Sequence, residues 1–122
     1  MTSLPTDKTE LNRLAAELLG LEFEFDGIVW LTHNVHLHQQ FHPCKSHDHA
    51  RMLIDFGVEK WQQHFMFAYA RHLRDIMMQK GGGVLMRPLA TLLTKPDAYD
   101  KTRAAVAAIL ELQEASHESD QV

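Results

Sequence analysis

The chain contains very little cysteine and no long apolar run. A single cysteine in 122 residues excludes an intramolecular disulfide framework and suits a reducing compartment. No apolar stretch approaches the roughly 20 residues that a membrane-spanning helix needs. The first ten residues, MTSLPTDKTE, lack the basic-then-apolar order of a secretion signal. We therefore expect a cytoplasmic protein that has no membrane partner.

Excess positive charge is also lacking. Lys and Arg number 12 against 16 Asp and Glu, which gives a formal net charge of −4 at pH 7. Without an overall positive field, nucleic acid is not an expected partner. A hydrophobic content of 45% is typical of a soluble globular chain, and the length suits one domain. We predict a single domain over residues 1–122, with frayed polar ends at 1–5 and 114–122.

Helical spacing indicates the first element. Apolar residues recur at i, i+3, i+4 and i+7 before Gly20, which is a typical residue just beyond a helix C-terminus. Ser3 or Thr6 is predicted to cap the N-terminus of this helix. The predicted buried face consists of Leu11, Leu14, Ala15, Leu18 and Leu19.

The next segment predicts a β-hairpin. Apolar and acidic residues alternate before Asp26-Gly27, the strongest short hairpin signal. A two-residue turn would place Phe25 opposite Ile28 and Phe23 opposite Trp30, with four apolar side chains on one face. The opposite face would then carry Glu22, Glu24, Val29 and Leu31.

Two further helices complete the predicted fold. Ser46 is a good N-cap for a central helix, or two helices, from His47 to Lys80. Residues 63–72 also alternate as a strand would, but helical spacing explains more of this region. The last helix is predicted to start within Thr94–Asp97. The fold class is therefore α+β: an N-terminal helix, a β-hairpin, a long or broken central helix, and a C-terminal helix packed on a small antiparallel sheet.

Residues 33–49, HNVHLHQQFHPCKSHDH, hold six of the nine histidines and the single cysteine. Imidazole and thiolate are the usual zinc ligands, and closely spaced pairs suit a tetrahedral site. The candidate metal ligands are His36, His38, His42 and Cys44. The segment nevertheless has neither the CxxC of zinc fingers nor the HExxH of metalloproteases. A solvated loop with locally hydrogen-bonded histidines is the favoured interpretation, so we predict no cofactor, with zinc as the alternative.

Arginines near the middle of the chain indicate an anion-binding surface. Arg71 and Arg74 flank His72, and guanidinium groups bind carboxylates and phosphates through paired hydrogen bonds. Two histidines and one arginine at the start of the central helix add further donors. The candidate binding residues are His47, His49, Arg51, Arg71 and Arg74.

Four segments in order resemble small phage proteins with an alpha-beta-alpha sandwich domain. These segments are LNRLAAELLG, DGIVWL, SHDHARML and TRAAVAAIL. The resemblance implies a phage or prophage accessory protein that binds a host factor or sequesters a small ligand. It also implies a strand over 63–72, and it assigns no catalytic residue.

We therefore expect a non-catalytic binding protein that acts on a protein partner or an anionic small ligand through the 33–49 loop and the neighbouring arginines. A zinc-binding protein or metal-dependent enzyme that uses the 33–49 histidines is one alternative. A structural homo-oligomer is another, because apolar residues are abundant between Leu53 and Met77.

Overall fold

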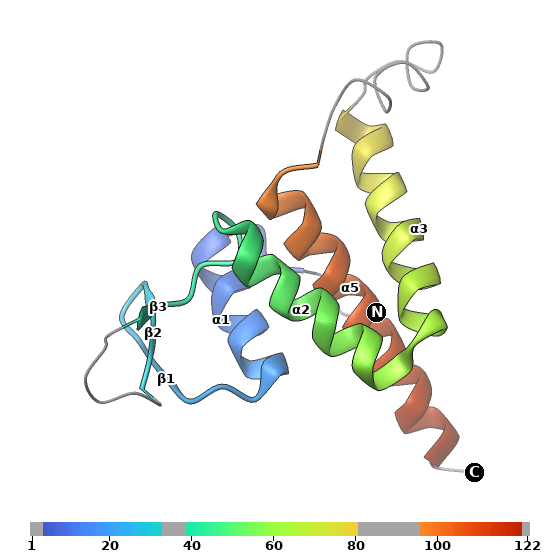
Figure 1. The fold of residues 1–122 in the computed structure, drawn as a ribbon, viewed down its shortest axis with the longest axis horizontal. Helices are drawn as coiled ribbons and strands as arrows, with labels where there is room; N and C mark the ends of the chain where they lie inside the picture. The colour runs from blue at the N-terminus through green and yellow to red at the C-terminus, as the bar shows by residue number, and fades with distance from the viewer. Residues whose placement is uncertain (1–3, 33–38, 81–95, 121–122) are drawn as a thin grey trace.

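A computed structural model describes residues 4–32, 39–80 and 96–120 of the chain. The helices pack together, and the strands lie at one end of the molecule beside the first helix (Figure 1). The predicted α+β class is confirmed. Within the described residues, no helix has both the length and the apolar content needed to cross a membrane. In chain order the elements are α1 (Lys8–Leu19), β1 (Phe23–Phe25), β2 (Val29–Leu31), β3 (Gln39–Gln40), α2 (His47–Trp61), α3 (Gln63–Lys80) and α5 (Ala98–Asp120).

Helix α5 forms the centre of the helical part and contacts α1, α2 and α3. Its inward face consists mostly of alanine, and small side chains let neighbouring helices approach closely. Its fully buried apolar members are Ala104, Ala105, Val106, Ala108 and Ile109. The antiparallel sheet, in the order β1-β2-β3, meets the helices where β2 contacts α1.

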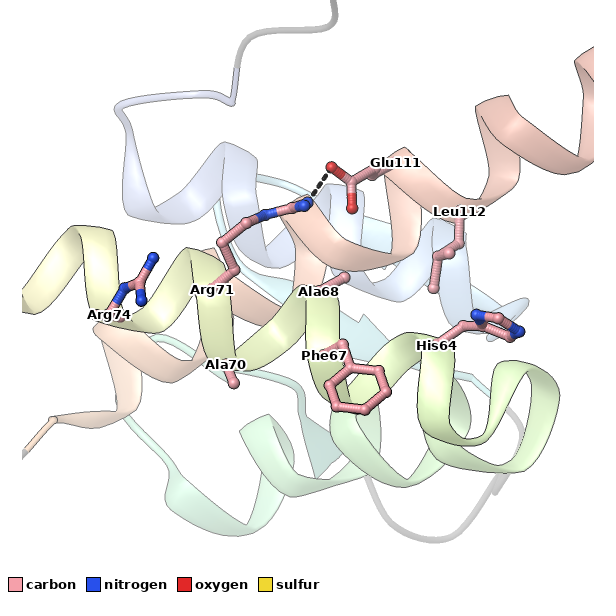
Figure 2. A pocket seen from close by; sticks show the side chains of 8 residues that line it. All are labelled: His64, Phe67, Ala68, Ala70, Arg71, Arg74, Glu111 and Leu112. Carbon is pink, nitrogen blue, oxygen red and sulfur yellow. Dashed lines mark hydrogen bonds and ion pairs between the residues drawn. The ribbon is translucent and has the colours of Figure 1, made fainter.

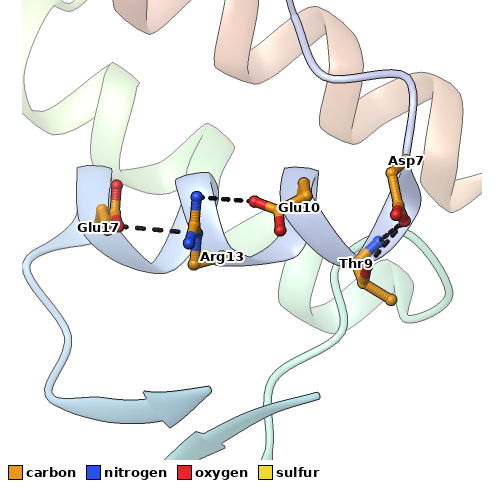
Figure 3. Close-up of polar contacts among 5 residues, drawn as sticks. All are labelled: Asp7, Thr9, Glu10, Arg13 and Glu17. Atoms are coloured by element: carbon orange, nitrogen blue, oxygen red, sulfur yellow. Dashed lines mark hydrogen bonds and ion pairs between the residues drawn. The ribbon is translucent and has the colours of Figure 1, made fainter. Parts of the chain in front are cut away.

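The ends of α1 follow from local chemistry. Its N-cap is Asp7, whose carboxylate accepts hydrogen bonds from the Thr9 backbone N–H at 2.9 Å and hydroxyl at 2.7 Å (Figure 3). Both bonds lower the pKa of Asp7 below its usual value, and the bond from the Thr9 hydroxyl has the larger effect. The prediction of Ser3 or Thr6 as the cap was wrong, because Asp7 is adjacent to the first turn and adds a negative charge at the positive end of the helix. Gly20 ends the helix as predicted, with a left-handed φ of 72°.

The exposed face of α1 carries Arg13 between two glutamates (Figure 3). Its guanidinium lies 2.7 Å from a carboxylate oxygen of Glu10 and 4.0 Å from one of Glu17. The same group lies over the ring of Phe25, 5.2 Å from its centre. Exposed ion pairs contribute at most about 1 kcal/mol each. The additional role of Arg13 is to connect α1 with the hairpin.

The hairpin forms, but its predicted register was wrong by one residue. Phe25 pairs with Val29 and Phe23 with Leu31, so the connection has three residues instead of two. Val29 and Leu31 are therefore buried, at 1% and 4% exposure, whereas Ile28 is 41% exposed. One extra residue in the connection moves every later side chain to the opposite face of the sheet.

The side chain of Asp26 explains the longer connection. Its Oδ1 accepts the Ile28 backbone N–H at 3.1 Å and the Trp30 ring Nε1–H at 3.3 Å. The first of these bonds closes an Asx-turn, which competes with a two-residue β-turn. Gly27 adopts a φ of 99° between them, a conformation that favours glycine.

The central helical segment is broken in two. As predicted, Ser46 caps α2, and its hydroxyl accepts the His49 backbone N–H at 3.2 Å. Gln62, with a φ of 55°, separates α2 from α3. Residues 63–72 are helical, which confirms the favoured interpretation, and the strand implied by the phage resemblance is not formed there.

Close packing joins the two halves of this segment. The ring of Phe65 on α3 is fully buried against Gly57 on α2. A Cβ atom placed at Gly57 would lie 2.3 Å from two carbons of that ring. Glycine at this position is therefore what allows the aromatic ring to enter the core.

Reciprocal capping starts α5 at Ala98. Asp97 Oδ1 accepts the Asp100 N–H at 2.8 Å, and the Asp97 N–H donates to Asp100 Oδ2 at 3.3 Å. This arrangement is that of a capping box. One turn further along, the buried hydroxyl of Thr102 donates to the Pro43 carbonyl at 2.8 Å. That bond fixes the connection before α2 to the central helix.

Candidate functional site

A groove between α3 and α5 has a volume of about 530 Å³ (Figure 2). Pockets for small ligands usually measure between 300 and 1,000 Å³. Six lining residues come from α3 and two from α5. They are His64, Phe67, Ala68, Ala70, Arg71, Arg74, Glu111 and Leu112. Two of the five predicted binding residues, Arg71 and Arg74, are therefore brought together.

The two arginines are in different electrostatic states. Arg71 Nη2 forms an ion pair with Glu111 Oε1, which connects α3 to α5 across 40 residues of sequence (Figure 2). Arg74 lies one turn along α3 and has no ion-pair or hydrogen-bond partner within the described part of the chain. One guanidinium is consequently satisfied by the protein, and the other is available to a ligand.

An apolar surface adjoins these charges. Phe67 is 73% exposed, the largest exposure among the large hydrophobic residues described. It lies on the same helix as Phe65 and Ala68, both of which are buried. Exposed aromatic rings beside arginines are common at binding surfaces. The lining of the groove thus includes both a guanidinium group that can bind an anion and an exposed aromatic ring.

His72 follows Arg71 on α3. Its Nε2 atom is buried, has no hydrogen-bond partner, and lies 3.8 Å from Glu111 Oε1. The carboxylate oxygen that holds Arg71 is therefore also the near neighbour of this imidazole.

The other predicted binding residues lie elsewhere. His49 lines a separate hollow of about 380 Å³ beside the sheet, and its ring stacks on Phe41 with a centre-to-centre distance of 5.2 Å. Burial lowers the pKa of His49, and the nearby His42 lowers it further. His47 is exposed, with Nδ1 at 3.4 Å from Lys101 Nζ. Arg51 is exposed and lies 3.9 Å from Asp55, so these three residues do not share the groove with Arg71 and Arg74.

The proposed metal ligands are only partly described. His36 and His38 lie outside the described residues. Cys44 is a buried thiol that contacts the Lys8 carbonyl at 3.7 Å, and burial raises its pKa to about 11. His42 donates its backbone N–H to His49 Nδ1 at 3.1 Å. Among the residues of known placement, no three His, Cys, Asp or Glu side chains are arranged to hold a metal ion, and zinc stays a prediction.

No family model, no curated protein and no solved structure matches the chain. The resemblance to phage proteins therefore stays a prediction.

Besides the two arginines, the polar and aromatic side chains of the groove are His64, Phe67 and Glu111, and sequence reasoning selected none of them. Phe67 had a detectable signal, because it falls between the helical positions that are predicted to be buried and would therefore be an exposed aromatic. Glu111 had none, since its role depends on the pairing of α3 with α5.

Proposed function

We propose that the protein is a non-catalytic binding protein, and that the α3–α5 groove binds an anionic group carried beside an apolar one. The observation that supports this most directly is that one groove is lined both by Arg74, which has no partner in the described structure, and by the exposed ring of Phe67.

Local charge favours an anion at this position. The groove lining has two guanidinium groups and one carboxylate, which gives a formal charge of +1 with His64 neutral. The whole chain carries −4, so a small anion meets an attractive site on a protein that otherwise repels it. A planar carboxylate, phosphate or sulfate can accept two hydrogen bonds from the Arg74 guanidinium.

The apolar group supplies the second part of the affinity. Covering the exposed part of Phe67 removes up to roughly 150 Å² of apolar surface from water, which stabilises a complex by up to about 4 kcal/mol before the costs of association. A free anion such as sulfate gains none of this term. The preferred ligand therefore combines a negative charge with an aromatic or aliphatic group.

Two sources of such a group agree with this chemistry: an anionic small molecule, and an acidic side chain beside an apolar one on a protein partner. A host protein bound by a phage or prophage accessory product would be one such partner. Neither source requires a catalytic group, a metal or a cofactor in the groove.

Titration with phenyl sulfate tests the proposal. Amide resonances of the ¹⁵N-labelled protein should shift saturably for Phe67, Ala70 and Arg74, whereas sulfate alone and phenol alone should bind more weakly. Arg74→Ala should weaken binding about fivefold, because one partly exposed ion pair is worth up to about 1 kcal/mol. Arg51→Ala removes an exposed arginine outside the groove and should leave binding unchanged. Equal effects of the two variants, or no saturable shift, would refute the assignment of the site.

Oligomeric state is a separate prediction. The exposed Phe67 would also suit contact between two copies of the chain. Sedimentation equilibrium of the wild-type chain and of Phe67→Ser decides this, since a monomeric mass for both excludes a homo-oligomer through this ring.

A further inference from the structure

Four groove residues form a regular stripe along α3. His64, Phe67, Arg71 and Arg74 follow one another at spacings of three, four and three residues, and all four are exposed. Because an α-helix has about 3.6 residues per turn, positions three and four apart lie on the same face. Figure 2 shows these side chains in this order along the helix. We call this continuous surface the α3 stripe.

The α3 stripe is long compared with a small ligand. Ten residues separate His64 from Arg74, which corresponds to about 15 Å along the helix axis. Phe67 and Arg74 are separated by two turns, or about 10 Å of axial rise. Small-ligand sites usually direct a few polar groups toward one point. The polar and apolar groups of the α3 stripe lie along a line instead, which favours an elongated occupant.

The second wall of the groove comes from α5. Helices α3 and α5 lie side by side and run in opposite directions (Figure 1), and α5 contributes Glu111 and Leu112 to the lining. On α3, Ala68 and Ala70 line the groove with small side chains, which let another helix approach closely. A groove of this kind is a common binding surface for an amphipathic helix, whose side chains at i, i+3, i+4 and i+7 enter it. A third helix therefore matches the length of the α3 stripe.

Charge complementarity indicates which kind of helix would bind. Arg74 has no partner within the described part of the chain, whereas Arg71 is paired with Glu111. With His64 neutral, the groove keeps a formal charge of +1. Phe67 precedes both arginines on α3, so the apolar and the basic parts of the stripe are separate. A complementary helix has an apolar side chain at the level of Phe67 and carboxylates one and two turns further along.

We propose that the α3 stripe docks an acidic amphipathic helix of a protein partner, with an apolar side chain against Phe67 and a carboxylate paired with Arg74. This inference rests on the proposed function of the groove, and it selects a protein segment over a small molecule as the ligand. A second copy of the chain is less suitable as the partner. A two-fold contact brings the same patch of both copies together, so the positively charged stripe would face itself.

Fluorescence anisotropy with a labelled alanine-rich peptide tests the docking. The peptide has about 18 residues, enough to form a helix in part, with two leucines one turn apart followed on the same face by two glutamates. We expect saturable binding about tenfold tighter than that of phenyl sulfate, because the leucines cover more apolar surface. A peptide with the glutamates moved to the opposite face, and one with a central proline that breaks the helix, should each bind more weakly. Equal binding of all three peptides would overturn the inference.

Variants of the α3 stripe identify the contacts. Phe67→Ser should weaken peptide binding about tenfold. Met66→Ser is the matched control, since Met66 is also exposed on α3 but does not line the groove, and this variant should leave binding unchanged. Arg74→Glu should reverse the charge preference, so that a peptide with lysines in place of the glutamates binds more tightly. A charge preference that is unchanged in Arg74→Glu would contradict the docking. Thermal unfolding followed by circular dichroism verifies that each variant is folded.

Comparison of the peptide with phenyl sulfate separates this inference from the proposed function. If phenyl sulfate binds in the groove and the peptide does not, the docking is wrong and the proposed function stands with a small molecule as the ligand. If neither binds, both are wrong. Sedimentation equilibrium tests the remaining occupant. A dimer that Phe67→Ser converts to a monomer would show that the α3 stripe contacts a second copy of the chain, which would also overturn the inference.

Discussion

Replacing Gly57 by alanine should change the stability of the protein through two opposing effects, helix propensity and core packing. In a helix interior, alanine is favoured over glycine by about 1 kcal/mol, so helix propensity alone predicts stabilisation. The new Cβ atom, however, would lie 2.3 Å from two ring carbons of Phe65 and 2.6 Å from a third. Carbon atoms in contact are separated by about 3.5–4.0 Å, so α2 and α3 would have to move apart or the ring would have to leave its position.

The packing effect should prevail. Phe65 is fully buried, which leaves its ring no open space into which to turn, and overpacking of a core usually costs about 1–3 kcal/mol. An overlap this severe lies at the upper end of that range. After subtraction of the helix-propensity gain, Gly57→Ala should lower the free energy of unfolding by about 2 kcal/mol.

Urea denaturation followed by far-ultraviolet circular dichroism measures this change. A loss of about 2 kcal/mol corresponds to a midpoint lower by roughly 1 M urea. Phe65→Ala supplies the control through a double-mutant cycle, because Gly57→Ala should become neutral or stabilising once the ring is removed. If Gly57→Ala equals or exceeds the wild type in stability, the close approach of α2 and α3 at this point is wrong.

Three further predictions concern other parts of the molecule. Thr102→Val removes the hydroxyl that donates to the Pro43 carbonyl and should lower the free energy of unfolding by about 1–2 kcal/mol in the same urea titration. Thr102→Ser retains a hydroxyl and should keep most of that stability. The Cys44 thiol, whose pKa burial raises to about 11, should react with iodoacetamide at pH 8 far more slowly in the folded protein than in urea, and equal rates would contradict its burial. Burial, and to a lesser extent the neighbouring His42, lowers the pKa of His49, so the unfolded state binds more protons at this residue than the folded state does. The contribution of His49 to stability should therefore decline as the pH falls from 7 to 5. His49→Asn keeps an acceptor for the His42 N–H and should reduce the pH dependence of the thermal unfolding midpoint.

Hairpin register shows where sequence reasoning stops. Asp26-Gly27 correctly located the turn, because both residues favour turns on their own. The number of residues in the connection depended on the Asp26 carboxylate, which binds the Ile28 N–H and the Trp30 ring N–H. A side chain that reaches two and four residues ahead competes with the turn, and alternation alone does not reveal which arrangement prevails.

The candidate site was predictable only in part. Arg71 and Arg74 were identifiable because a basic pair at i and i+3 lies on one side of a helix. Their separation from His47, His49 and Arg51 was not, since the distance between two helices depends on how they pack. The zinc hypothesis depended on residues 33–49. In the described portion, His42 bonds to His49, and Cys44 contacts α1 through Lys8 and Asn12.

The sequence by itself determined the helices, the position of the hairpin, the cap at Ser46 and the glycine stop at Gly20. Each of these features depends on hydrogen bonds and side-chain spacing within a few residues, so the local chain contains the necessary information. Only the tertiary structure shows which residues line the groove, because the pairing of Arg71 with Glu111 joins residues that are 40 positions apart. Such a contact exists only after α3 and α5 have buried their apolar faces against each other, and that packing places one carboxylate oxygen between an arginine and a histidine.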